Sequence, residues 1–212
     1  HRDLHSFPTR RSSDLVKLII KENYSLNKPL IIYNITNNKL NSNTINQRID
    51  FVLKKNSSLK LINLFDDSSN NNFININYQF KIEKDAILKN YKIDHKLNSN
   101  IKYFFNNIEL EHNSVAETFI FSTGSKFIKN EINCNLNDKY SSAFINGIIN
   151  LKGDQHHEIK TNINHLAENT KSYQLIKSAL NDNSKGVYQG KIFVNSKAQK
   201  TDGYQLDRKS VV

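Results

Sequence analysis

The sequence predicts an all-β fold in which successive coils of chain stack into a solenoid. Apolar and polar residues alternate with a period of two, short polar turns separate the alternating runs, and no long stretch has a helical pattern. Turn-like pairs that begin at Asn56, Asp85, Asn113, Ser141, Asn169 and Lys197 recur every 28 or 29 residues. This spacing is typical of a repeat whose coil holds about two strands, although the 33 asparagines make chance recurrence a competing explanation.

The first alternating runs lie in the N-terminal half. Every second residue is apolar over 74–83, which predicts a strand with one buried face. Residues 45–53 are ambiguous, because their apolar residues fit both a strand and a helical stripe. The strand is favoured there, since polar residues 56–58 interrupt the run and apolar residues resume it at 59–62.

Strands are also expected in the C-terminal half. Residues 132–137 and 159–164 alternate more weakly, and 173–205 has the pattern strand, turn, strand, turn, strand. Gly186 suits a corner, and Gly190 suits a bulge or a close backbone approach. A stack of this kind leaves an open strand edge at each end, which must be capped or paired.

Composition excludes several classes of protein. The chain has 212 residues, a formal net charge of +10 and one cysteine. One thiol excludes a disulfide framework, and it excludes a multi-cysteine zinc or iron–sulfur site supplied by this chain alone. No apolar run approaches the length of a membrane-spanning helix. Because the lysines are scattered, the charge favours a solvated surface over a nucleic-acid-binding stripe.

The two ends differ in composition from the rest of the chain. Four of the five arginines lie in residues 1–15 and 207–212, and methionine is absent throughout. Both ends look like translated sequencing-adapter oligonucleotides, so we expect them to be non-native and disordered. The expected organisation is therefore a tail over 1–15, a partial lead-in over 16–45, a β-helix core over 46–206 and a tail over 207–212. The chain is expected to be a fragment of a longer protein.

Residues with metal-binding chemistry do not converge in the sequence. His157 and His165 would share one strand face, but eight residues of strand separate them by roughly 26 Å. His156 points to the opposite face, beside Glu158. Cys134 occupies an apolar position and is expected to be a small buried hydrophobe. No nucleotide-binding loop, nucleophile elbow or zinc-protease motif is present. We therefore predict no catalytic, cofactor-binding or metal-binding residue.

The C-terminal block closely resembles the core of the SufB/SufD family of iron–sulfur cluster assembly proteins. Residues 186–194 and 198–205 match the family's G-V-F-x-G-K-I-x-V and A-Q-K-T-D-A-Y-Q wording, and the SufD form fits better than the SufB form. The motif residues are Gly186, Val187, Gly190, Lys191, Ala198, Gln199, Lys200, Thr201, Asp202, Tyr204 and Gln205. Residues 46–49 and 59–63 look like the family's entry into this core, with Arg48 on its arginine and Gln47 in place of its proline.

The resemblance implies a right-handed parallel β-helix. It also implies a non-catalytic scaffold subunit in the cytoplasm, with a SufB-like paralogue and a SufC-like ATPase as partners and with neither nucleic acid nor membrane. The complex would assemble an iron–sulfur cluster, and this chain would bind no cofactor itself. The family's cluster-site histidine and its SufC-binding helices fall beyond the end of this chain, so none of its functional residues is carried over.

Two other functions remain as alternatives. A β-helix carbohydrate-active enzyme, such as a polysaccharide lyase, would need convergent carboxylates or a Lys or Arg base in a groove. A nucleic-acid-binding protein would need a basic stripe interleaved with aromatic side chains. The alternating runs show neither pattern.

Overall fold

The computed structural model describes residues 15–36 and 39–211, which form fourteen strands and no helix. None of the described residues therefore belongs to a helix long and apolar enough to cross a membrane. The strands are β1 (Leu15–Ile20), β2 (Leu30–Thr36), β3 (Thr44–Leu53), β4 (Ser58–Asp67), β5 (Phe73–Ile82), β6 (Ile87–Asp94), β7 (Ile101–Leu110), β8 (Val115–Ser122), β9 (Phe127–Leu136), β10 (Ser142–Leu151), β11 (His156–His165), β12 (Lys171–Leu180), β13 (Lys185–Val194) and β14 (Asp202–Val211).

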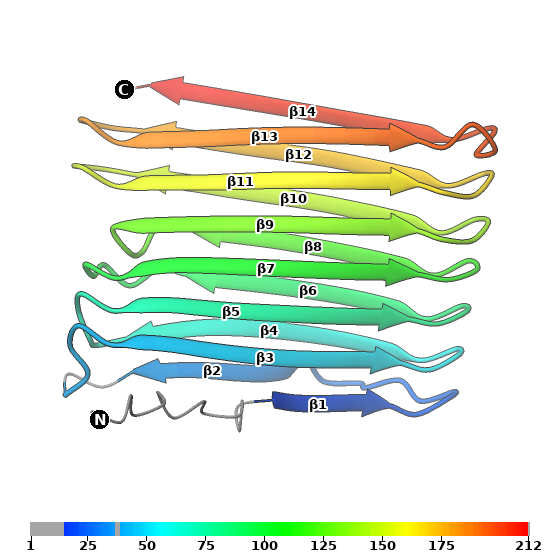
Figure 1. Cartoon of the computed structure of the whole chain (residues 1–212), viewed down its shortest axis with the longest axis horizontal. Coiled ribbons are helices and arrows are strands. Elements are labelled where there is room, and N and C mark those ends of the chain that lie inside the picture. The colour runs from blue at the N-terminus through cyan, green and yellow to red at the C-terminus, as the bar shows by residue number, and fades with distance from the viewer. Residues whose placement is uncertain (1–14, 37–38, 212) are drawn as a thin grey trace, which may run out of the picture.

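The strands form two parallel sheets of seven strands each, as Figure 1 shows. Odd-numbered strands form one sheet and even-numbered strands the other; we call them the odd sheet and the even sheet. Each coil contributes one strand to each sheet. The register between successive coils advances by 26 residues (Ile101 to Phe127) to 33 residues (Leu15 to Arg48). The predicted all-β solenoid and its repeat are therefore confirmed.

The core lies between the two sheets, because every second side chain of each strand points inward. In β5 the inward residues Ile74, Ile76, Tyr78, Phe80 and Ile82 are all buried. Stacking between coils extends this pattern, since the rings of Phe51 and Phe80, which are register partners, have centroids 5.0 Å apart. Burying such a side chain contributes roughly 1.5–3 kcal/mol, so the inward columns stabilise the stack.

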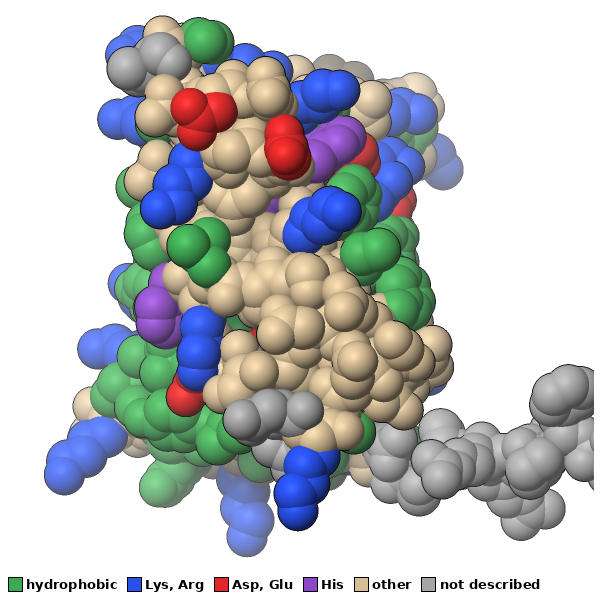
Figure 2. Space-filling view, turned by 90° about the vertical axis from the view of Figure 1, so that its left-hand side faces the viewer, with side chains coloured by type: hydrophobic (Ala, Val, Ile, Leu, Met, Phe, Trp, Pro, Cys, Tyr) green, Lys and Arg blue, Asp and Glu red, His purple; other side chains and the backbone are tan. Residues whose placement is uncertain are grey.

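Corners depend on residues that accept the left-handed backbone conformation. Asn56, Asp85, Asn113 and Asn169 have φ between 52° and 58°, which asparagine and aspartate tolerate better than most residues. These are four of the six predicted turn positions, so the recurrence of these pairs has a structural cause. Figure 2 looks onto the opposite set of corners, where polar side chains and backbone dominate the middle and hydrophobic side chains gather toward the margins.

The ends differ in part from the expectation of disorder. Residues 207–211 continue β14 and pair in parallel with Ile176–Leu180 of β12. This pairing satisfies backbone groups that an unstructured tail would leave to water, which explains the difference. Residues 1–14 and 212 lie outside the described part of the chain. Within 16–45, β1 and β2 already stack on β3 and β4. The non-native origin of the ends and the domain boundaries stay predictions.

Candidate functional site: the closing coil and a buried ion cluster

The family-like motif forms the last coil of the stack, which we call the closing coil (β13, β14 and the turn between them). Gly186 to Lys191 lie in β13, which pairs with β11 on one side. Ala198 is buried in the turn, and the Asn169 amide donates to the Gln199 carbonyl of that same turn. The motif therefore fixes how this coil is laid on the preceding one.

Gly190 permits a close approach inside the closing coil. A side chain there would meet Tyr188 Oη at 2.5 Å and Gln205 Oε1 at 2.6 Å. Tyr188 Oη donates to Gln174 Oε1 at 3.1 Å, and burial raises the pKa of this phenol. Gly190 and Gln205 thus face each other across the interior, which gives these two motif residues a packing role.

Tyr204 lies on the outer side of β14 and stacks on Tyr173 of β12, with ring centroids 5.1 Å apart. Lys200 has a φ of 55° and forms the corner before β14. Within the described part of the chain, the side chains of four motif residues form no hydrogen bond or ion pair: Val187, Lys191, Thr201 and Asp202. As a whole the motif shapes an edge of the solenoid and gathers no set of reactive groups.

The three histidines stay apart, as predicted. His157 accepts from or donates to Ser122 Oγ through Nδ1 at 2.8 Å, and its Nε2 donates to the Ser125 carbonyl at 3.0 Å. Because that carbonyl can only accept, Nε2 carries the proton and Nδ1 accepts from Ser122. His165 bonds Thr170 and Ser172 at the other end of β11. His156 lies on the outer face, 3.1 Å from Glu158.

Cys134 is fully buried, as predicted, and burial raises the pKa of its thiol. Across residues 15–36 and 39–211, no group of three or more His, Cys, Asp or Glu side chains could hold a metal ion.

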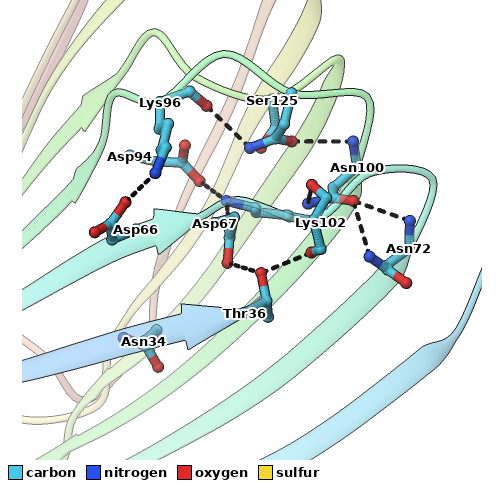
Figure 3. A network of polar contacts seen from close by, with 12 residues as sticks. Asn34, Thr36, Asp66, Asp67, Asn72, Asp94, Lys96, Asn100, Lys102 and Ser125 are labelled. Carbon is cyan, nitrogen blue, oxygen red and sulfur yellow. Dashed lines mark hydrogen bonds and ion pairs between the residues drawn. The ribbon is translucent and has the colours of Figure 1, made fainter. Parts of the chain in front are cut away.

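A charged cluster that sequence reasoning missed lies inside the solenoid. Lys102, at the start of β7, forms ion pairs with Asp67 at the end of β4 and with Asp94 at the end of β6, the latter at 2.6 Å (Figure 3). All three side chains are at most 3% exposed. Thr36 donates to Asp67 at 2.8 Å, and Ser69 donates to Thr36 at 2.7 Å. At the corner beside this cluster, the backbone and side-chain amides of Asn72 both donate to Asn100 Oδ1.

A second buried amine lies next to this cluster. Lys92 Nζ donates to Asn130 Oδ1 at 2.5 Å and lies 3.0 Å from the centre of the Phe104 ring. Burial lowers the pKa of Lys92 well below its ordinary value; Asp94 opposes this shift and Lys102 adds to it. Burial also raises the pKa of Asp94, against the effect of Lys102. Lys102 is thus the cation that balances the two aspartates.

Comparison with protein families decides between the functions left open by the sequence. The family model described as the SufBD core domain of the SUF system for FeS cluster assembly matches residues 34–210. The chain belongs to this family. Its role is therefore in FeS cluster assembly, and the match does not separate SufD from SufB. A search of curated proteins found no match.

Within this SufBD core, both carboxylates of the buried cluster, Asp67 and Asp94, are enclosed between the sheets. A polysaccharide lyase would need its acidic groups in an open groove, whereas Asp67 and Asp94 are each 2% exposed. The cluster therefore has the character of a structural ion network.

Gly124 is the residue of the SufBD core that leaves room for this network. A methyl group there would overlap Asp94 Oδ1 and lie 2.9 Å from the Lys96 carbonyl oxygen. We expect Gly124→Ala to lower the free energy of unfolding by about 1–3 kcal/mol, because the backbone must shift or the ion pair must reorganise. Urea denaturation measures this loss.

Gly203→Ala is the matched control, since its methyl group would make only ordinary contacts at 3.4 Å and beyond. We expect it to change stability by less than about 0.5 kcal/mol. Equal losses in the two variants would contradict the role given to Gly124.

Proposed function

We propose that this chain is a SufD-like, non-catalytic scaffold subunit of a complex with a SufB-like paralogue and a SufC-like ATPase, acting in the cytoplasm. The amino-acid sequence of residues 198–205, which resembles SufD more than SufB, supports this choice within the SufBD core family. The proposed cargo is the nascent iron–sulfur cluster, which this chain would help to build without holding a cofactor of its own.

The closing coil is the observation that carries the proposal. β13 pairs with β11 and β14 pairs with β12, so the motif spans both sheets. Phe193 of β13 and Tyr204 of β14 are exposed apolar side chains on the outer faces of this coil, and exposed apolar side chains of this kind mark contact surfaces for a partner protein. The family-like residues lie on this coil and shape it. A scaffold role is further supported by the ion cluster, whose charged groups bind one another.

Co-expression with SufB-like and SufC-like proteins from the same genome tests the proposal. We expect the three chains to co-purify after affinity capture and gel filtration. Phe193→Asp, on the outer side of β13, should weaken co-purification because it adds a charge to the closing coil.

Ile19→Asp, on the outer side of β1 at the opposite edge of the same sheet, is the matched control and should leave co-purification unchanged. Failure of the unaltered chain to bind either protein would overturn the proposal. Equal loss with both variants would contradict the placement of the contact at the closing coil.

A further inference from the structure

The outward side chains of the even sheet form columns that run across all its strands; we call this surface the even face. The register places Ile62, Tyr91 and Phe119 in one column and Leu64, Ile93, Phe121 and Ile148 in the next. A third column runs from Glu117 to Phe144, Tyr173 and Tyr204. At the N-terminal end Ile31 and Tyr33 extend the first two columns. The even face is thus apolar over several adjacent strands.

The outer face of the odd sheet is different. One of its columns is apolar, from Phe73 to Ile101 and Phe127, but asparagines recur in the others and bond each other between coils, as Asn162 does with Asn133 at 2.8 Å and Asn164 with Asn135 at 2.7 Å. Both outer faces belong to parallel seven-stranded sheets, so they differ in their side chains and not in their backbone. A polar ladder suits water, whereas a contiguous apolar sheet face marks an interaction surface.

The size of the even face fits a protein interface. Strands about 4.8 Å apart and about 30 Å long give seven strands a face of roughly 900 Å², against about 800 Å² per partner in a standard interface. At its middle, Tyr91, Phe119 and Phe144 line a hollow of about 290 Å³, with Glu117 and Asn146 beside them. A hollow lined by aromatic rings at the centre of an interface is where an apolar anchor of a partner binds best.

The charges around the even face are net positive. Its acidic residues Glu117 and Asp66 are already paired, with Lys89 at 3.0 Å and with Lys96. Among the described residues of this face outside the expected non-native tail, the cations without an ion-pair partner are Lys60, Lys171 and Lys177, against the single acid Asp202. Two copies placed face to face would bring these cations together in a chain of net charge +10. The free charges therefore favour an acidic partner over a second copy.

We propose that the even face binds an acidic protein segment that presents one apolar side, with an apolar anchor in the hollow at Tyr91, Phe119 and Phe144. This inference goes beyond the scaffold function, because it concerns the outer face of one sheet and needs neither of the partners proposed for the closing coil. An anionic membrane is the less favoured occupant, because membrane binding usually takes a cluster of basic residues, and these cations are spread over the face.

Two synthetic peptides of about 20 residues, which span about 30 Å as helices, test the proposal with the full chain. Both carry leucine on one side; one has glutamate flanks and the other lysine flanks. By fluorescence anisotropy at low ionic strength, we expect the glutamate peptide to bind at least tenfold more tightly. The double variant Phe119→Thr/Ile148→Thr should weaken its binding at least tenfold. Lys171→Glu/Lys177→Glu should reverse the preference between the peptides.

Phe105→Thr, on the outer face of the odd sheet, is the matched control and should leave binding unchanged. Thermal melts confirm that each variant folds. The proposal is overturned if both peptides bind equally, or if the even-face variants bind like the unaltered chain. It is also overturned if sedimentation shows a dimer that Phe119→Thr/Ile148→Thr dissociates, or if that variant loses binding only to anionic phospholipid vesicles. None of these results depends on co-purification with SufB-like or SufC-like proteins.

Discussion

Replacing Lys102 with methionine is expected to lower the free energy of unfolding by about 3–5 kcal/mol at pH 7, the scale measured when one partner of a buried ion pair is removed. The substitution keeps the volume but leaves Asp67 and Asp94 facing each other inside the solenoid. Burial lowers the pKa of Lys92, the second buried amine beside Asp94, and so holds it toward its neutral form. The two carboxylates therefore cannot both stay ionised there, and at least one must take up a proton. For a domain with a net stability of about 5–15 kcal/mol, the loss is large.

The sign of the pH dependence follows from linkage. In Lys102→Met the aspartates bind protons more tightly in the folded than in the unfolded state. The folded state then holds more protons above a pH of about 4, so stability falls as pH rises. The deficit of the variant should therefore be larger at pH 7 than at pH 5, which urea denaturation at both values measures.

Two further variants separate charge from packing. Lys102→Met combined with Asp67→Asn and Asp94→Asn should recover most of the loss, because amides of the same shape carry no charge. Lys54→Met removes an exposed lysine that pairs with Glu83 at 2.7 Å, and it should have a much smaller effect. If the triple variant were no more stable than the single one, the loss would come from packing and not from unbalanced charge.

The same cluster explains where sequence reasoning succeeded and where it failed. Residues 74–83 were predicted correctly because apolar side chains of β5 point inward and polar ones outward. In β6 this order is reversed: Asn90, Lys92 and Asp94 point inward while Tyr91 and Ile93 point outward. Period-two reasoning assigns the apolar side of a strand to the core, so it does not recognise such a strand.

Two features were unexpected, the buried ion cluster and the apolar even face. The signal for both was a strand such as β6, whose polar residues point inward and whose apolar residues point outward. A lysine or an aspartate on the inward side needs a polar partner inside the solenoid. Asp67 and Asp94, at the ends of β4 and β6, are 27 residues apart, and both pair with Lys102 at the start of β7. The outward apolar residues of β6 and β8 form the even face for the same reason. Reading the columns by repeat instead of by strand would have brought these residues together.

Lowering the pH from 7 to 4 is expected to destabilise the chain through His157, by up to about 3 kcal/mol. Burial lowers the pKa of this imidazole to about 4; the Ser125 carbonyl partly opposes the shift, and His156 and Lys102 add to it. Its unfolded pKa is about 6.5, so only the unfolded state gains a proton as the pH falls between these values. The stability that the neutral imidazole contributes is complete above pH 6.5 and is lost on the way to pH 4.

His157→Gln should remove this part of the pH dependence. Glutamine keeps a polar side chain near Ser122 but cannot titrate, so the stability difference between the unaltered chain and the variant should shrink steadily from pH 7 to pH 4. Urea denaturation across this range measures the difference. Ile159→Val, a buried change on the same strand, should cost about 0.5–1.5 kcal/mol at every pH. A difference for His157→Gln that is as constant as that of Ile159→Val would show that His157 is protonated equally in both states, and would contradict the neutral, Nε2-protonated imidazole that the Ser125 and Ser122 hydrogen bonds require.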